Sequence, residues 1–486
     1  MTAKAISILG TSSHVGKTWV VAGLCGLFAD RGIRVAPFKA QNMSLNAYIT
    51  DEGFEMSYAQ ALQAWSAGLE PSVLMNPVLL KPETGSRSQL IVNGVVHGPY
   101  ESGHFRDKRD ELFAVVRDSY DELARQYDVI LVEGAGSPVE LNLMQTDLSN
   151  IRLAEYADAS IVLVGDIDRG GIFASLYGTT ALLPPQARNR LKGILVNKFR
   201  GDITLFDEGI RMLRELTGVP VLGVIPYVEM PFPQEDSLGV PWGGRKEGHI
   251  TICVVRLPFM SNFTDYDPFL FEPEVNLFYS ATPPSLRPAM IIIPGSKNTL
   301  SDLTWLKATG WEDSIGRWAQ EGTMVAGICG GFQMMGASVQ DPLGMEGAAA
   351  AMSGLGLLPI DTVLRPRKVT RQIHGRAVAR PYRGHIILGY EQHMGETRPV
   401  SGSSFNFGPL IVLDDHTDGL INVEGNLWGT YIHGIFHNTE FRHAVIRQLG
   451  GHGIMTENPF DRVIRQWKEV IAKHVDLATL FRLVGG

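Results

Sequence analysis

The sequence predicts an α/β protein with two domains, in each of which a mostly parallel sheet is flanked by helices. Short, continuous apolar runs alternate with helical patterns in the first half of the chain, and a second alternating series fills the other half. A stretch rich in proline, glycine and charged residues separates the two series. The length of 486 residues also exceeds that of one compact core. We therefore expect a first domain at residues 1–230, a linker at 231–248 and a second domain at 249–486.

The expected elements follow from the apolar runs. In the first domain, residues 5–9 are expected to form a buried strand, and residues 17–30 a helix. Further strands of this domain are expected at residues 35–38, 129–132, 160–164 and 193–196. In the second domain, strands are expected at residues 249–255, 289–293, 323–328 and 427–432. Because these runs are apolar on both faces, they are typical of parallel strands that helices cover on either side.

The composition excludes several classes of protein. There are 43 Lys+Arg and 51 Asp+Glu residues, and the net charge of −8 argues against a broad basic surface for nucleic acid or membrane. Only 3 cysteines are present, which excludes a disulfide framework and indicates a reducing compartment. The N-terminus lacks the pattern of a signal peptide, and no uncharged apolar run is long enough to span a membrane. We expect a cytoplasmic protein, and its oligomeric state stays open.

A phosphate-binding loop is predicted at residues 10–18, Gly-Thr-Ser-Ser-His-Val-Gly-Lys-Thr, between the first strand and the first helix. In a loop of this kind the backbone N–H groups point inward, and the helix N-terminus adds positive potential for phosphate. The Lys17 ammonium is expected to reach the terminal phosphates, and the Thr18 hydroxyl to bind Mg²⁺. The residues of the loop expected to bind ATP are Gly10, Thr11, Gly16, Lys17 and Thr18.

Residues elsewhere in the first domain are candidates for the same site. Glu133 ends an apolar strand at the sheet edge where ligands bind, so its carboxylate is expected to hold Mg²⁺ beside the nucleotide phosphates. Asp51, after a polar run, is a second candidate ligand of Mg²⁺. Lys39 is expected to neutralise a transferred phosphoryl group, and Asn197 to face the nucleotide base. The alternative interpretation of Lys39 and Asp51 is a solvated loop charge.

A candidate nucleophile follows an apolar strand of the second domain. Cys329 lies in the sequence Gly-Ile-Cys-Gly-Gly, between this strand and a helical stretch. A sharp strand-to-helix turn of this kind strains the backbone of the nucleophile and requires small neighbours. The N–H of Gly330, and that of Gly295 in another glycine turn after a strand, are expected to stabilise an oxyanion. Cys25 and Cys253 lie within apolar patterns and are expected to be structural.

A thiolate that takes part in acyl transfer needs a partner for proton transfer, and the chain has 13 histidines. His433 is the first candidate because it ends a strand-like run, at the sheet edge where catalytic groups collect. His393 is the main rival, and His374 and His437 are weaker candidates. Spacing alone leaves this choice open.

The segment Gly-Ile-Cys-Gly-Gly-Phe-Gln at residues 327–333 resembles the nucleophile motif of class I glutamine amidotransferases. These enzymes carry their histidine on a late strand, in a pattern similar to residues 429–433, and this resemblance favours His433 over His393. Typical members have a glutamate two residues after the histidine, but this chain has Ile435 there. The resemblance therefore implies either a Cys/His dyad or a different group that orients the histidine.

Longer motifs resemble the cobyric acid synthase family almost from end to end. The phosphate loop has five residues between its glycines and is similar to that of the dethiobiotin-synthetase-like branch of P-loop proteins. The other matching segments are residues 38–46, 60–64, 75–82, 133–138, 166–171, 256–258 and 261–265. The resemblance implies a P-loop NTPase-like first domain and a class I glutamine amidotransferase-like second domain, with ATP, Mg²⁺ and glutamine as reactants.

The resemblance also implies a reaction. The substrate would be a corrinoid, adenosylcobyrinic acid a,c-diamide, whose b, d, e and g carboxylates would be amidated in turn. Two polar segments are expected either to line the substrate region or to form hydrogen-bonded loops. Their candidate residues are Gln41, Asn42, Ser44, Asn46, Asn262 and Asp265.

Two other functions stay open on the sequence alone. A cobyrinic acid a,c-diamide synthase-like amidase would use the same two chemistries, although the block at residues 38–46 favours the cobyric acid synthase family. A P-loop switch ATPase would hydrolyse ATP without forming an amide, but the turn at Cys329 and the position of His433 argue against it.

Overall fold

The structure is a computed structural model that forms two compact units. The described residues are 3–83, 87–101, 105–233, 249–347, 350–400, 406–455 and 457–485. Unit 1 comprises Met1–Ser44, Glu55–Met230 and Phe460–Gly486, and unit 2 comprises Leu45–Phe54 and Pro231–Pro459. Most of the expected linker, residues 234–248, lies outside the described residues. Within the described part, no helix is long and apolar enough to cross a membrane.

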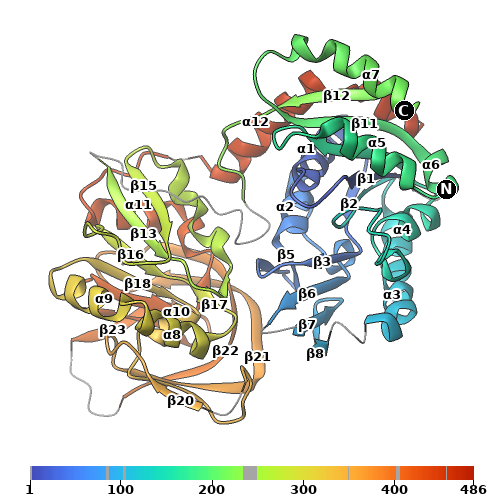
Figure 1. Cartoon of the computed structure of the whole chain (residues 1–486). Helices are drawn as coiled ribbons and strands as arrows, with labels where there is room; N and C mark the ends of the chain where they lie inside the picture. Colours follow the sequence, from blue (N-terminus) through green and yellow to red (C-terminus); the bar gives the residue numbers. More distant parts are fainter. Residues whose placement is uncertain are drawn as a thin grey trace. The chain divides into compact units, whose positions relative to one another are not determined.

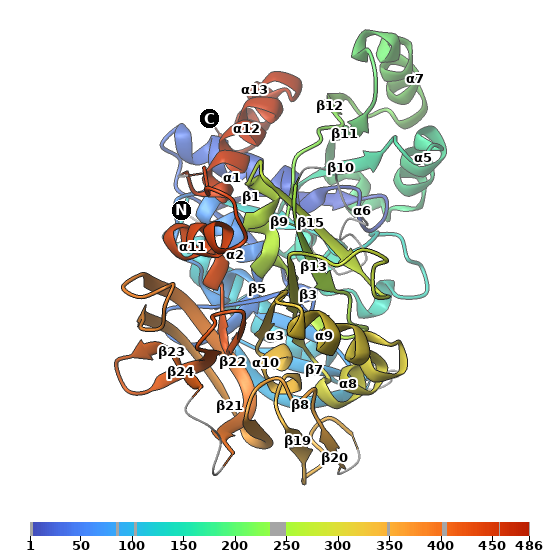
Figure 2. The ribbon, with the colours of Figure 1, turned by 90° about the vertical axis from the view of Figure 1, so that its left-hand side faces the viewer.

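Each unit is made from separate stretches of sequence, whereas we expected two contiguous domains. The segment Leu45–Phe54 belongs to unit 2, where the backbone N–H of Ala47 donates to Asn262 Oδ1 at 3.1 Å and its carbonyl accepts from Tyr390 Oη at 2.9 Å. The end of the chain belongs to unit 1, where helix α12 (Pro459–His474) packs on helix α1 (Lys17–Asp30) (Figures 1 and 2). These contacts join residues far apart in the chain, so no local pattern predicts them.

Unit 1 is built on a parallel sheet in the order β12-β11-β10-β1-β9-β2. Its strands are β1 (Lys4–Gly10), β2 (Val35–Phe38), β9 (Val129–Glu133), β10 (Ser160–Asp166), β11 (Leu191–Phe199) and β12 (Val221–Pro226). All the strands expected in the first domain are present. The apolar side chains of β1, β9 and β10 are fully or almost fully buried, as continuous apolar runs require when helices cover both faces of a sheet.

The helices of unit 1 are α1, α2 (Tyr58–Ser66), α3 (Phe105–Gln126), α4 (Ile151–Tyr156), α5 (Ile172–Leu182), α6 (Pro185–Arg190), α7 (Asp207–Thr217), α12 and α13 (Leu477–Leu483). Helix α1 is buried on almost every side because it packs on the sheet and is also covered by α2 and α12. A smaller sheet in the order β3-β6-β7-β8 adds to the unit. Its strands are β3 (Gln41–Met43), β6 (Val78–Pro82), β7 (Arg87–Val92) and β8 (Val95–Glu101), and the short strand β5 is Glu55–Ser57.

Unit 2 also contains a parallel sheet, in the order β15-β13-β16-β18-β25. These strands are β13 (Ile250–Val255), β15 (Val275–Ser280), β16 (Met290–Ile293), β18 (Met324–Ile328) and β25 (Leu427–Thr430). Antiparallel strands that we did not predict extend this sheet beyond β25. They are β21 (Ile360–Ala377), β22 (Ile386–Pro399), β23 (Phe407–Leu413) and β24 (Thr417–Asn422), and the short strands β19 (Ser338–Asp341) and β20 (Ala350–Ser353) pair at the β21 end.

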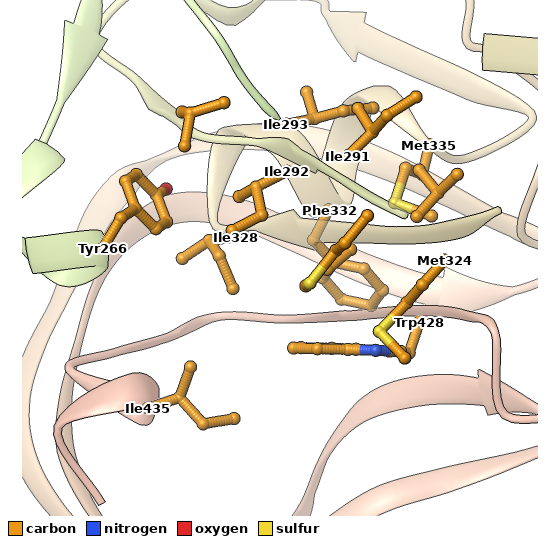
Figure 3. Packing of buried hydrophobic residues seen from close by; sticks show 14 of the residues in the cluster. Tyr266, Ile291, Ile292, Ile293, Met324, Ile328, Phe332, Met335, Trp428 and Ile435 are labelled. Carbon is orange, nitrogen blue, oxygen red and sulfur yellow. The ribbon is translucent and has the colours of Figure 1, made fainter. Parts of the chain in front are cut away.

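The core of unit 2 lies between the sheet and its helices α8 (Thr299–Ala308), α9 (Trp311–Gln320), α10 (Gly330–Met334) and α11 (Thr439–Gln448). Figure 3 shows Met324, Phe332, Met335 and Trp428 close together in this core, where all of these side chains are buried. The short strands β4 (Ala47–Ile49), β14 (Met260–Ser261), β17 (Gly295–Ser296) and β26 (Ile432–His433) and the 3₁₀ helix η5 (Phe263–Phe271) complete the unit. They lie next to the candidate active site described below.

Candidate functional site

The candidate nucleophile of unit 2 sits in a strained turn between β18 and α10. Cys329 has φ 52° and ψ −108°, a conformation that residues with a side chain rarely adopt. Its backbone N–H donates to the Thr430 carbonyl on β25 at 2.8 Å, and its own carbonyl accepts from Gln333 N at 3.1 Å. These bonds hold the strained turn in place. The expected strand-to-helix turn is therefore present.

The small neighbours of Cys329 are explained by close backbone contacts. A Cβ added to Gly331 would lie 1.9 Å from the Ile293 carbonyl oxygen, a distance that real side chains do not show. A side chain at this position would push the turn away from β16. The repeated glycines of the motif thus allow α10 to begin directly against the sheet.

His433 reaches the site because the chain changes partners at Tyr431. Strand β25 pairs with β18, and Thr430 lies opposite Ile328. After Tyr431 the chain continues as β26, which pairs with β22 and places His433 opposite Tyr390. His433 is 1% exposed, and its side chain interacts with that of Cys329, whose Sγ also donates to the Gln392 carbonyl at 3.5 Å. The structure therefore brings together the cysteine and the histidine that the sequence favoured.

Asp265 is the group that orients His433, and this corrects our expectation that Asp265 lies in the substrate region. His433 Nδ1 donates to Asp265 Oδ2 at 2.6 Å, and Gly434 N donates to Asp265 Oδ1 at 3.0 Å. Asp265 comes from the first turn of η5 and is buried. In typical class I amidotransferases a glutamate two residues after the histidine orients that histidine. Asp265 takes its place here. The arrangement is a Cys–His–Asp triad, not a dyad.

The charge of Asp265 keeps His433 protonated. Burial lowers the pKa of His433, but the Asp265 carboxylate and the hydrogen bonds to Asp265 and Cys329 outweigh burial and raise this pKa to about 10. At neutral pH the imidazole beside Cys329 is thus an imidazolium. An imidazolium at this position has a proton ready for the leaving group of an acyl transfer.

The rival histidines have other partners. His393 Nδ1 donates to the Gly395 carbonyl at 2.9 Å, and its ring stacks on Tyr431 at 3.8 Å. Burial lowers the pKa of His393 to about 4, so this ring is neutral. His437 Nε2 donates to the Thr264 carbonyl at 3.2 Å, and His374 is exposed on β21. None of these contacts joins a histidine other than His433 to Cys329.

The two glycines expected at the oxyanion lie against the triad. A Cβ added to Gly295 would be 3.2 Å from His433 Cε1, and one added to Gly330 would be 2.8 Å from Ser296 N. The turn after β16 and the turn at Cys329 are therefore in direct contact. Asp302 holds the first of these turns, because Ser296 Oγ donates to Asp302 Oδ2 at 2.6 Å.

A cavity of about 950 Å³ in unit 2 is lined by Phe332 and Tyr431, which are close in sequence to Cys329 and His433, and by the rival histidine His393. Charged side chains of both signs also line it, namely Arg365, Arg367, Arg371, Glu391, Glu396 and Asp418. An amino acid carries an ammonium and a carboxylate, so mixed charge of this kind suits a zwitterionic ligand.

The three cysteines are expected to differ in reactivity. Cys25 and Cys253 are fully buried, and burial raises the pKa of both thiols, that of Cys253 to about 12. Cys329 is 7% exposed and lies beside an imidazolium. We expect iodoacetamide to alkylate Cys329 first in the native protein, as read by peptide mass spectrometry, and all three cysteines after denaturation. Equal labelling of Cys25 or Cys253 in the native state would contradict this prediction.

The phosphate loop of unit 1 has the geometry expected for an anion site. Gly16 caps α1 with φ 97°, which a glycine adopts without strain, so the loop turns directly into the helix. Lys17 Nζ donates to the carbonyls of Ser12 and Gly136, each at 2.9 Å, and thus lies across the loop. Thr11 N donates to the Val164 carbonyl at 3.0 Å and ties the loop to β10.

The Glu133 carboxylate contacts the other candidate side chains of this site. Thr18 Oγ1 donates to Glu133 Oε1 at 2.9 Å, and Lys39 Nζ donates to the same oxygen at 2.8 Å. Glu133 is fully buried at the end of β9. A carboxylate and a hydroxyl that meet beside a phosphate loop are ligands that suit Mg²⁺. Thr18, Glu133 and Lys39 are therefore brought together as expected.

Asp51 is the other candidate ligand of Mg²⁺. It lies in the segment Leu45–Phe54 of unit 2 and is exposed there. Within the described residues, no three His, Cys, Asp or Glu side chains converge to hold a metal ion. Thr18 and Glu133 are the candidate ligands that unit 1 itself supplies, and the role of Asp51 stays a prediction.

Asn197 braces the phosphate loop from β11. Its Nδ2 donates to the Val15 carbonyl at 2.8 Å, and its Oδ1 accepts from Lys198 N at 2.9 Å. A Cβ added to Gly16 would lie 2.3 Å from Asn197 Nδ2. We expected Asn197 to face the nucleotide base, whereas this side chain is buried and contacts the protein backbone.

Most residues expected in the substrate region are instead buried in hydrogen-bonded networks. Asn262 Nδ2 donates to Gln392 Oε1 at 3.3 Å, and Asn46 Oδ1 accepts from Thr264 Oγ1 at 3.0 Å. Asn42 Nδ2 donates to Ser57 Oγ at 2.7 Å. The buried members of the set are Asn42, Ser44, Asn46, Asn262 and Asp265. The alternative interpretation, hydrogen-bonded loops, holds for these side chains.

Gln41 is the exception, because it lines an open pocket next to the phosphate loop. This pocket of unit 1 has a volume of about 1110 Å³ and is also lined by Ser12 and Ser13 of the loop. Its apolar lining includes the exposed side chains of Met43 and Leu143. Alternation along β3 puts Gln41 and Met43 on the pocket side and Asn42 on the buried side. The pocket has room for a large ligand beside the phosphates.

Two family models match the chain. The CobQ/CobB/MinD/ParA nucleotide binding domain matches residues 6–232, and the CobB/CobQ-like glutamine amidotransferase domain matches residues 251–441. Each model covers one of the two predicted sheets, and the predicted fold class is confirmed.

Three relatives named cobyric acid synthase show how far the similarity extends. The protein of Thermosynechococcus vestitus is 44% identical over 450 residues, which cover 91% of this chain and 90% of that protein. The protein of Clostridium acetobutylicum is 40% identical and covers 99% of this chain and 98% of its own length. The protein of Chloroflexus aggregans is 45% identical and covers 93% of this chain and 92% of its own length.

Proposed function

Because the chain belongs to the cobyric acid synthase family, we propose that it amidates the b, d, e and g carboxylates of adenosylcobyrinic acid a,c-diamide with ATP and glutamine. The observation that carries the proposal is the similarity to cobyric acid synthases over almost the whole chain. The matched part of the chain includes both the triad and the phosphate loop. The similarity favours this function over an a,c-diamide synthase-like amidase and over a switch ATPase. We place the reaction in the cytoplasm, where ATP and glutamine are available.

In unit 2, glutamine is the nitrogen donor. The Cys329 thiolate attacks the side-chain amide carbon of glutamine, and Gly330 N–H and Gly295 N–H stabilise the oxyanion of the tetrahedral intermediate. The His433 imidazolium, held by Asp265, gives its proton to the nitrogen that leaves as ammonia. The neutral imidazole then takes a proton from water, which hydrolyses the γ-glutamyl thioester and regenerates the thiolate.

In unit 1, the acceptor carboxylate is activated before ammonia attacks. A carboxylate is a poor acyl donor because its leaving group would be oxide, whereas an acyl phosphate releases phosphate. The carboxylate oxygen attacks the γ-phosphorus of ATP and ADP leaves, and the N–H groups of residues 10–18 and the Lys17 ammonium bind the phosphate charge. We propose that Thr18 and Glu133 hold Mg²⁺, which would neutralise the developing charge.

Lys39 and the pocket of unit 1 complete this half of the reaction. Lys39 is buried beside Glu133, where its ammonium is positioned to stabilise the transferred phosphoryl group. The acceptor is expected to enter the pocket lined by Gln41 and Met43, because that pocket reaches Ser12 and Ser13 of the loop. Its apolar lining suits the ring of a large macrocycle.

Mass spectrometry of the corrinoid tests the proposed function. The protein is incubated with adenosylcobyrinic acid a,c-diamide, MgATP and glutamine labelled with ¹⁵N in its amide. We expect four stepwise incorporations of the label, in each of which an amino group replaces a hydroxyl group. Consumption of ATP without incorporation into this acceptor would contradict the proposal and would favour a switch ATPase or another acceptor.

Lys17→Ala is expected to stop amidation with either nitrogen source. The ammonium joins the Ser12 carbonyl of the loop to the Gly136 carbonyl after β9, and we expect it to reach the terminal phosphates, so its loss should lower the rate at least about 100-fold. Label incorporation is measured with glutamine and with ammonium chloride. Lys192→Ala is the control, because Lys192 is exposed and donates to the Asn189 carbonyl. Full ammonia-driven activity of Lys17→Ala would remove the loop from the mechanism.

A further inference from the structure

Glu133 is held by two glutamines of helix α2 whose role the proposed function does not explain. Gln63 Nε2 donates to Glu133 Oε2 at 2.6 Å, and Gln60 Nε2 donates to the same oxygen at 3.4 Å. Both glutamines are fully buried. They are three residues apart on α2, so they project from the same face of the helix.

The two oxygens of Glu133 thus have different surroundings. Oε2 accepts from the neutral amides of Gln60 and Gln63, whereas Oε1 accepts from the Thr18 hydroxyl and the Lys39 ammonium. The amides fix the plane of the carboxylate and direct Oε1 toward Thr18. They add no charge, so the site keeps its affinity for a cation. A second lysine or an arginine in the place of Gln63 would compete with the metal.

Gln63 also joins Glu133 to the phosphate loop. The same Nε2 donates to the Thr18 carbonyl at 3.1 Å, at the start of α1. One amide therefore sets the spacing between the strand that carries Glu133 and the helix that carries the Thr18 hydroxyl. Gln63 Oε1 is buried and has no hydrogen-bond partner within the described residues, so it is available to a donor such as a water molecule on a bound cation.

Gln60 extends the connection to the segment that follows Lys39. Its Oε1 accepts from Asn42 Nδ2 at 3.2 Å, and Asn42 lies on β3. The Lys39 carbonyl in turn accepts from Asn76 Nδ2 at 3.1 Å. The motifs at residues 38–46, 60–64 and 75–82 therefore meet around a single carboxylate.

We propose that Gln63, supported by Gln60, is a positioning residue that presents Glu133 Oε1 and Thr18 Oγ1 as a pair of metal ligands. This inference rests on the proposed role of Glu133 in holding Mg²⁺. The amide acts through Glu133 and not on the reactants. Loss of the Gln63 amide removes the 2.6 Å bond to Oε2 and leaves the bonds from Thr18, Lys39 and Gln60, so Glu133 stays in place but is held less firmly. The effect is therefore expected on metal affinity and not on the affinity for metal-free nucleotide.

Gln63→Met tests the proposal, because methionine has a similar length and shape but no N–H donor. Mn²⁺ binding to the protein with ADP is followed by electron paramagnetic resonance, and binding of metal-free ADP by calorimetry. We expect the dissociation constant for Mn²⁺ to rise about 10- to 100-fold and that for metal-free ADP to stay unchanged. Ser66→Ala, on the same helix with its hydroxyl on the Leu62 carbonyl, is the matched control and should bind Mn²⁺ like the unaltered protein.

Further variants distinguish an error in the proposed metal ligand from an error in the proposed positioning role. Glu133→Gln should weaken Mn²⁺ binding even more, and unchanged binding in Glu133→Gln would overturn the proposed metal ligand itself. Weakened binding in Glu133→Gln together with unchanged binding in Gln63→Met would overturn only the positioning role. If Gln63→Met does not fold, as judged by thermal melting, Gln60→Met takes its place. Its bond to Glu133 is longer, so a few-fold increase is expected, and unchanged binding would overturn the proposal.

Discussion

Cys329→Ser is expected to abolish glutamine-driven amidation and to leave ammonia-driven amidation intact. A serine hydroxyl beside an imidazolium keeps its proton, so it cannot replace the thiolate as nucleophile. The rate with glutamine should fall at least about 10⁴-fold, which is typical of the loss of a nucleophile from a catalytic triad. The residues proposed to activate the carboxylate with ATP lie in unit 1, so added ammonia should still be used.

The measurement is label incorporation into the corrinoid with either nitrogen source, together with the release of glutamate. Cys253→Ser is the matched control, because Cys253 is a buried thiol of the same unit, lies on β13 and has its Sγ 4.0 Å from the Val254 carbonyl. The control should keep both activities if the enzyme folds. Retention of glutamine-driven activity by Cys329→Ser would show that the nucleophile lies elsewhere.

The parts of the fold and of the site that carry local signals could be predicted from the sequence. The strands of both parallel sheets are continuous apolar runs, and the phosphate loop and the turn at Cys329 are short motifs with their own spacing. The strand-like run before His433 makes it the first candidate, but the choice over His393 depends on the family resemblance. A single sequence gives no distance from either histidine to Cys329.

Asp265 could not be assigned, because it lies 168 residues before His433 and meets it only through the tertiary fold. Its neighbours Asn262 and Thr264 show the same limit. They resemble ligand-binding loop residues in sequence, but in the structure they fasten the segment Leu45–Phe54 through Ala47 N and Asn46 Oδ1. A polar run predicts hydrogen bonds, but it does not indicate whether the partner is a ligand or another part of the chain.

The set of chain segments that forms each unit also depends on the tertiary fold and not on local sequence. Helix α12 lies at the end of the sequence but packs in unit 1, where Trp467 Nε1 donates to the Trp19 carbonyl at 2.6 Å. The apolar face of α12 predicts that the helix is covered, but it does not say which unit covers it. Boundaries drawn from composition alone therefore placed α12 in the second domain.

Asp265→Asn is expected to lower glutamine hydrolysis by on the order of 10³- to 10⁴-fold, the usual effect when the carboxylate of a triad becomes an amide. The asparagine fits the same space but loses the charge that raises the pKa of His433. Its amide also no longer favours the Nδ1–H form of the imidazole. Ammonia-driven amidation should be unaffected, because the residues proposed for carboxylate activation lie in unit 1.

Asp267→Asn is a matched control in the same 3₁₀ helix. Burial, and then the charge of Asp265, raise the pKa of Asp267 well above its ordinary value. A raised pKa favours the neutral acid, and the asparagine amide has the shape of that group, so glutamine hydrolysis should stay within a few-fold of that of the unaltered enzyme. A large loss in this control would mean that η5 tolerates no substitution and that the effect at Asp265 reports on folding.

The pH dependence of glutamine hydrolysis shows whether the Asp265 carboxylate sets the protonation of His433 or only supports the fold. Hydrolysis requires the His433 imidazolium as proton donor to the leaving nitrogen, so kcat/KM should fall as the pH rises through the pKa of His433, about 10. In Asp265→Asn burial is no longer opposed by the carboxylate charge, so this pKa falls and the decline should begin at lower pH. The residual activity of the variant should therefore be greatest on the acid side. An unchanged basic limb in Asp265→Asn would mean that Asp265 does not set the protonation of His433, whatever the loss in rate.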